Sequence, residues 1–206
     1  MDTPAGTIHL LTVCGSLQRR SSNRAALDVV AAVARGAGAV VDDFERLAAI
    51  PPFDPDREAE PNAVLDDWRA RLAVADAVLV AAPEYAGGVA GVVKNAFDWV
   101  VGTGSMYRKP IAVISAGTSG GVHARQTLIQ TLTWQGGWVV GELGIAAPRA
   151  KTGPDGGFTD PPTIAAITDV TEHLLAASRT SPAELAALAA TVVGAFRIDP
   201  AHVAPA

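Results

Sequence analysis

The sequence predicts an α/β fold in which one five-stranded parallel sheet is covered by helices on both faces. Two observations carry this prediction. Short apolar runs alternate with longer segments whose apolar residues recur at helical spacing. The apolar runs are nearly continuous, which is typical of strands buried on both faces, and the alternation implies helical crossovers between parallel strands. With 206 residues, the chain is long enough for one domain with a full core.

Five strands are expected, and the third is the clearest. Its sequence, AVLVAA, contains only apolar residues and ends at Pro83, so we expect it in the middle of the sheet. The first run is apolar apart from His9 and Thr12, and the second becomes acidic as it ends. The strands are expected over residues 8–13, 39–44, 77–82, 111–114 and 138–140.

Six helices are expected between and after these strands. Asn62 can cap the second helix, and Ser181, Pro182 and Glu184 form a capping box for the last one. The helices are expected over residues 24–35, 63–72, 89–101, 121–134, 164–174 and 182–196. Prolines make 50–56 a loop, and 153–157 should form a tight turn. We expect residues 1–180 to form one domain, and 181–206 a C-terminal helix and tail that packs on it or extends from it.

Composition narrows the class of protein. The net charge is −5 with no basic block, which argues against a nucleic-acid partner. No apolar stretch approaches 18 residues, and no positive region precedes the first apolar run, so we expect no membrane span and no signal peptide. A cytoplasmic location is the default expectation. The single cysteine, Cys14, is expected as a small buried residue at a strand end.

The loop that joins the first strand to the first helix reads CGSLQRRSSN, from Cys14 to Asn23. The first N–H groups of a helix have no partner within the helix and face a positive dipole end. Together with Gly, Ser and Asn they can cradle a phosphate. The loop matches neither the P-loop nor the dinucleotide fingerprint G-x-G-x-x-G. The alternative is a plain polar turn in which Ser22 only caps the helix.

Three Gly-rich loops follow predicted strands, at residues 15–23, 83–91 and 115–121. The carboxyl ends of parallel strands meet at one edge of the sheet, where ligands bind. We therefore expect these three loops to converge on one site.

The same loops resemble motifs of the NAD(P)H-dependent FMN reductase family, which has a flavodoxin-like fold. GSLQRRSSNR is similar to its phosphate loop G-S-L-R-x-x-S-x-N. PEYAGGVAGVVKNAFDW resembles its P-E-Y-N-x-S-x-P-G-x-L-K-N-A-x-D-W stretch, and SAGTSGGVHARQTL resembles its S-x-G-x-G-G-x-R-A-x-x-x-L segment. The likeness covers roughly residues 7–175.

The resemblance implies a bound FMN. The first loop would hold its phosphate, the second would pass along the ring and ribityl chain, and the third would close the other side of the ring. Gly87 and Gly88 would leave room for the nicotinamide of NADPH or NADH. The implied cofactor-binding residues are Ser16, Gln18, Arg19, Ser21, Ser22, Asn23, Pro83, Glu84, Tyr85, Ala86, Gly87, Ser115, Gly117, Thr118, Gly120 and Gly121.

The sequence also departs from the family motifs. An arginine of the phosphate loop is Gln18 here, so Arg19 or Arg20 would neutralise the phosphate unless both are surface residues. The family asparagine of the second loop is Ala86, and the arginine of the third segment is His123. His123 either touches a ligand or, as we favour, lies exposed on a first helical turn.

The implied function is an FMN-dependent NAD(P)H oxidoreductase. Hydride would pass from the nicotinamide to FMN and then to a small acceptor: a quinone, a nitro or azo compound, a metal oxyanion or free flavin. Such a site needs no catalytic acid–base pair from the protein. Surface apolar residues, with Trp99 and Trp134 as examples, suggest a homodimer or homotetramer.

Two alternatives stay open. One is a flavodoxin-like FMN-binding or electron-carrier protein without turnover. The other is a serine hydrolase, because Gly117-Thr-Ser-Gly-Gly121 fits G-x-S-x-G with Ser119 as nucleophile. That alternative leaves the first two loops without a role.

Overall fold

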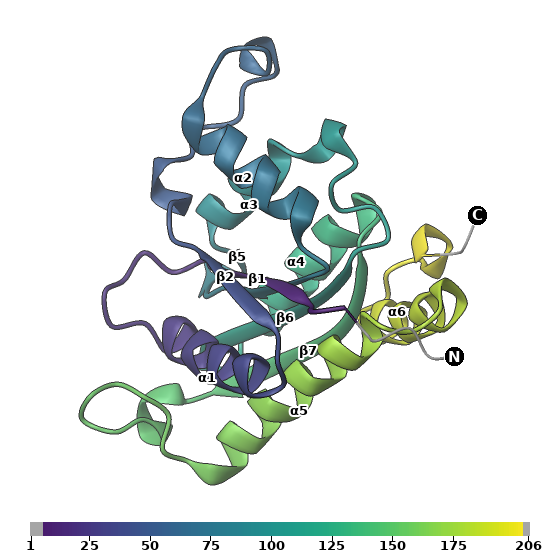
Figure 1. The fold of residues 1–206 in the computed structure, drawn as a ribbon. Helices are drawn as coiled ribbons and strands as arrows, with labels where there is room; N and C mark the ends of the chain where they lie inside the picture. Colours follow the sequence, from purple (N-terminus) through teal and green to yellow (C-terminus); the bar gives the residue numbers. More distant parts are fainter. Residues whose placement is uncertain (1–5, 204–206) are drawn as a thin grey trace.

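The computed structural model describes residues 6–203, and Figure 1 shows it as one sheet with helices above and below. Five parallel strands pair in the order β2-β1-β3-β6-β7. They are β1 (His9–Cys14), β2 (Val40–Phe44), β3 (Ala77–Ala81), β6 (Pro110–Gly117) and β7 (Trp138–Ala146). The predicted flavodoxin-like sheet is confirmed. After β2 the chain returns to the opposite side of β1, which places the switch point of the sheet between β1 and β3.

Helices cover both faces of the sheet in two groups (Figure 1). The first group is α1 (Ser22–Gly36) and α5 (Pro161–Ala177), which pack on each other. The second is α2 (Ala63–Val74), α3 (Gly91–Asp98) and α4 (Val122–Trp134). The core lies in both interfaces, and every residue of β3 in the centre of the sheet is buried.

Two predicted strands were too short. They were expected to end at Ile114 and Val140, and the residues that follow include Ser115, Gly141 and Glu142. The ladder nevertheless continues to the pair formed by Gly117 and Ala146. β7 is an edge strand whose second half is only partly buried, so its sequence does not read as a continuous apolar run.

The helix predicted over 89–101 is also shorter. Gly88–Val89 (β5) pairs antiparallel with Glu84–Tyr85 (β4), so the chain is still extended at Val89. α3 begins at Gly91 and ends at Asp98, and a short 3₁₀ turn follows. The cap of α1 is Ser21 and not Ser22, because the Ser21 side chain accepts the N–H of Asn23.

The last helix, α6 (Pro182–Ala195), packs against β7 at the edge of the sheet. The expected capping box is present: Ser181 N–H donates to the Glu184 carboxylate at 3.0 Å, and Glu184 N–H donates to Ser181 Oγ at 3.3 Å. Its buried residues Leu185, Ala189 and Val193 belong to the main hydrophobic core. Residues 1–5, which were part of the signal-peptide argument, and residues 204–206, at the end of the predicted tail, lie outside the described residues.

The two tryptophans proposed as surface residues differ. Trp99 is only 1% exposed, and its Nε1 donates to the carbonyl of Pro51 at 2.8 Å, so that expectation is wrong. Trp134 is 65% exposed and stacks on His202 with 5.0 Å between ring centroids. Within residues 6–203, no helix combines the length and the apolar character needed to cross a membrane.

Candidate functional site

A cavity of about 980 Å³ lies at the carboxyl edge of the sheet, between the loops that follow β1, β3, β6 and β7. The convergence expected of the first three loops is therefore observed. Of the predicted site residues, those that line the cavity are Ser16, Gln18, Arg19, Ser21, Ser22, Asn23, Pro83, Glu84, Tyr85, Gly117 and Thr118. Ala86, Gly87, Ser115, Gly120 and Gly121 are not part of its wall.

The loop between β1 and α1 offers backbone donors to the cavity. In the described part of the chain, no hydrogen bond engages the N–H groups of residues 19–22. Gln18 N–H donates to Ser16 Oγ at 3.3 Å, which curls the start of the loop. Gly15 is required here, because a Cβ at this position would lie 2.9 Å from Ala82 Cβ and would also collide with Val93. Free N–H groups at the start of a helix suit a phosphate.

Asn23 ties this loop to the one that follows β6. Its side chain is 3% exposed, accepts the Ala116 N–H at 2.9 Å and donates to the Ala116 carbonyl at 3.1 Å. Both polar atoms of the amide are thus engaged by backbone. The side chain fixes the spacing between two walls of the cavity.

The second loop is a tight hairpin. Ala86 and Gly87 both have positive φ, 51° and 73°, as a two-residue type I′ turn between β4 and β5 requires. Glu84 lines the cavity, but its Oε2 accepts the N–H groups of His123 and Ala124 at 2.8 and 3.1 Å. It therefore caps α4 from outside, where its negative charge also complements the helix dipole. His123 is exposed, as expected for a first helical turn.

The third loop is closely packed at its end. Gly121 has φ of 60°, and a Cβ there would lie 2.6 Å from Ser115 Cβ. The Ser115 hydroxyl is buried and has no hydrogen-bond partner among the described residues. Gly121 and Ser115 thus shape the loop from behind the cavity wall.

The fourth wall, residues 147–157, was missed by the sequence analysis. It is an ordered hairpin: Thr152 bridges Phe158, and Gly153 N–H donates to the Gly157 carbonyl at 2.8 Å. The signal was available, since this loop also follows a parallel strand and contains the tight turn that was predicted. Because the fifth strand was predicted to end at Val140, and not at Ala146, the loop at 147–157 was not expected to follow a strand directly at the carboxyl edge of the sheet.

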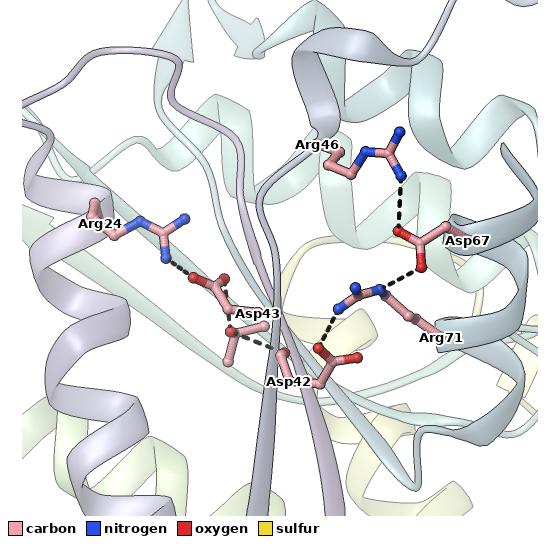
Figure 2. A network of polar contacts seen from close by, with 7 residues as sticks. Arg24, Asp42, Asp43, Arg46, Asp67 and Arg71 are labelled. Atoms are coloured by element: carbon pink, nitrogen blue, oxygen red, sulfur yellow. Dashed lines mark hydrogen bonds and ion pairs between the residues drawn. The ribbon is translucent and has the colours of Figure 1, made fainter. Parts of the chain in front are cut away.

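Figure 2 shows a series of ion pairs that fixes the start of α1 to β2 and continues to α2. Thr12 joins it by donating to Asp43 Oδ1 at 3.0 Å. The series contains three arginines and three aspartates, and the neighbouring residues Asp42 and Asp43 of β2 join its two halves: Arg24, Asp43, Asp42, Arg71, Asp67 and Arg46. Arg24 lines the cavity, but its guanidinium is already paired with Asp43. Close by, burial raises the pKa of the Cys14 thiol, as expected for a structural cysteine.

No nucleophile–base pair is assembled around Ser119. Its side chain is exposed and makes no hydrogen bond to a histidine in the part of the chain that the structure covers. His202 instead stacks on Trp134, and His173 lies on α5 beside Gly141. The hydrolase alternative thus lacks a general base at its serine.

A family model described as NADPH-dependent FMN reductase matches residues 8–152. The chain belongs to this family. That membership confirms the predicted oxidoreductase class and the predicted use of FMN with NAD(P)H. The match ends inside the fourth wall of the cavity, at residue 152.

Among curated relatives of this FMN reductase family member, an NAD(P)H-dependent FMN reductase of Pseudomonas aeruginosa is 37% identical over 134 residues, covering 62% of this chain and 70% of its own. A 2-hydroxy-1,4-benzoquinone reductase of Burkholderia is 32% identical over 45% of this chain, which spans about half (49%) of that enzyme. The quinone reductase of Escherichia coli is 30% identical, over 59% and 70% of the two chains.

Among solved structures, the flavoenzyme NAD(P)H:(acceptor) oxidoreductase FerB of Paracoccus denitrificans superposes with a TM-score of 0.64. The alignment has 26% identity and covers 81% of this chain and 99% of FerB.

Proposed function

We propose that this protein transfers hydride from NADPH or NADH to bound FMN and passes the electrons to a small quinone-type acceptor. The observation that carries the proposal is the cavity at the carboxyl edge of the sheet, built from the three loops that bear the family motifs. Relatives named as quinone reductases support the acceptor class. The other acceptors expected from the sequence, such as nitro and azo compounds, would be tested beside quinones.

The residues present fit FMN. The N–H groups of residues 19–22 and the arginines of the same loop suit a phosphate, and the cavity volume lies within the usual range for a cofactor of this size. The ring would lie between Pro83–Gly87 and the loop Ser115–Gly121. FMN, when bound, supplies the hydride-accepting atom and the electron transfer itself.

The protein's own groups would bind and orient the reactants. Glu84 is engaged as the cap of α4, and Asp155 accepts the N–H of Gly157 at 3.1 Å, so both carboxylates help to hold the cavity walls in place. Tyr85 is 58% exposed at the mouth of the cavity and can cover one side of a flat ligand. Catalysis at this site would rest on stacking geometry and on hydrogen bonds from backbone groups.

The visible spectrum of the purified protein, taken before and after anaerobic addition of NADPH, tests the proposal. Flavin bands that bleach, and recover when benzoquinone is added, are the expected result, with parallel lines in double-reciprocal plots. Bound flavin that neither nicotinamide reduces would instead identify the electron-carrier alternative. Failure to bind FMN after reconstitution would refute both.

We further propose that the chain assembles as a homodimer or homotetramer in the cytoplasm. Trp134 and Tyr107 support the assembly, because they are 65% and 59% exposed, and Tyr107 lies against Gly136, two residues beyond Trp134. A monomer in sedimentation at micromolar concentration would contradict this. Fractionation of cells that express the tagged chain tests the location.

A further inference from the structure

We infer that Arg149, in the loop between β7 and α5, binds the FMN phosphate at the end of the cavity that it shares with the first turn of α1. This assignment rests on the proposed function, because it names a residue of the same site. Arg149 lies outside the three loops that carry the family motifs. It lines the cavity together with Ser22 and Arg24 of α1.

The backbone around Arg149 is anchored. Pro148 before it is buried, Ala147 N–H donates to the Thr118 carbonyl at 3.3 Å, and Ser119 bridges Ala146. Ala147 adopts a left-handed conformation (φ 47°), which turns the chain from β7 into the short 3₁₀ helix that carries Arg149. An arginine on a fixed backbone loses less freedom on binding a phosphate than one on a free loop.

The charges around the cavity leave Arg149 without a partner. Four arginines line it: Arg19, Arg20, Arg24 and Arg149. Arg24 is paired with Asp43, whereas within residues 6–203 no carboxylate lies within 4.0 Å of the other three. The nearest acid in the sequence of its own loop, Asp155, is turned into the hairpin by its bond to Gly157. Gln18, on the facing loop, adds no charge.

The topology places Arg149 at the phosphate end of the cavity. α1 and α5 cover one face of the sheet (Figure 1). The loops that lead into these two helices line the cavity. The β4–β5 hairpin packs on α4, which covers the other face. The free N–H groups of residues 19–22 therefore share their side of the cavity with Arg149, and the ring-binding hairpin lies across the sheet edge from both.

The test compares two flavins that differ only in the phosphate. FMN and riboflavin are titrated into the apoprotein, and dissociation constants are read from flavin fluorescence. Arg149→Ala should weaken FMN by about tenfold to a hundredfold, the usual effect of losing a charge-assisted bond, and change riboflavin by less than about threefold. The slope of FMN affinity against salt concentration should also become shallower. Arg179 is an exposed arginine that follows α5, and Arg179→Ala serves as the matched control for the loss of one positive charge.

Gln18→Arg in the Arg149→Ala background should restore most of the FMN affinity, because it returns a positive charge to the facing wall. Equal weakening of both flavins would show that Arg149 only supports the hairpin and would overturn the inference. So would unchanged FMN affinity in Arg149→Ala while the wild type binds FMN tightly. If the wild type binds neither flavin, the proposed function itself fails, and that outcome is distinct from both.

Discussion

Replacing Asn23 by alanine separates a structural role from a direct ligand role for this side chain. The amide makes two hydrogen bonds to the backbone of Ala116, at 2.9 and 3.1 Å, and is 3% exposed. Alanine would leave a buried N–H and a buried carbonyl without partners. Each unsatisfied group costs about 1–3 kcal/mol, so we expect Asn23→Ala to lower the free energy of unfolding by about 2–6 kcal/mol.

The assay is urea denaturation followed by circular dichroism, with the slope of the transition compared between variants. Gln130→Ala is the control, since Gln130 is an exposed amide on α4 and its loss should cost less than about 0.5 kcal/mol. Flavin titration adds a second readout. Because Asn23 sets the spacing between two loops, its loss should weaken FMN and riboflavin alike.

Two results would refute this reasoning. A loss of stability below about 1 kcal/mol would mean that water or another group replaces the amide bonds. A selective loss of FMN affinity with riboflavin unchanged would mean that Asn23 contacts the phosphate directly, as the family resemblance implies.

Three further predictions follow from packing and burial. Gly121→Ala forces a Cβ to 2.6 Å from Ser115 Cβ at a positive φ, so it should cost about 1–3 kcal/mol or more in a thermal melt, whereas Gly36→Ala, with open space around it, should not destabilise. Burial raises the pKa of Cys14, so the thiol of the native protein at pH 8 should react with iodoacetamide at least about tenfold more slowly than the thiol of protein unfolded in urea, and equal rates would contradict the burial. The stability that is linked to this thiol is present below its unfolded pKa and is lost as the pH rises through the raised pKa of the folded state. Deleting residues 181–206 uncovers the apolar face of β7 and should cost about 5 kcal/mol or more, while an unchanged melting temperature would show that α6 is a separate unit.

The sequence predicted the fold well because each layer leaves a periodic signal. The runs around Val13 and Leu79 are apolar on both faces, and the stripes of α1 and α3 repeat every three to four residues. The second half of β7 gave no such signal. As an edge strand it has Glu142 and Gly144 in its ladder, and Glu142 is compensated by an ion pair with Arg125 that no periodicity could reveal.

The polar contacts of the site could not be predicted from the sequence either, because the partners are far apart along the chain. Glu84 caps a helix that starts 38 positions later, and Asn23 bonds a backbone 93 positions away. Such partners are set by the approach of loops after the sheet has formed. The motif identified residues near the cavity, and only the fold shows which of them hold the walls together and which face the cavity.

Ala86 stands where the family motif has an asparagine. A type I′ turn needs positive φ at both central residues, where asparagine and glycine are comfortable and alanine is strained. The turn nevertheless forms at Ala86–Gly87. It is held by the pairing of β4 with β5 and by the hydrogen bond that Glu84, in β4, accepts from the first turn of α4. The hairpin of this chain thus forms without an asparagine side chain at this position. This is what one expects if the ring-binding wall works through backbone groups and shape, with charge supplied from the α1 and β7 loops on the other side of the sheet edge.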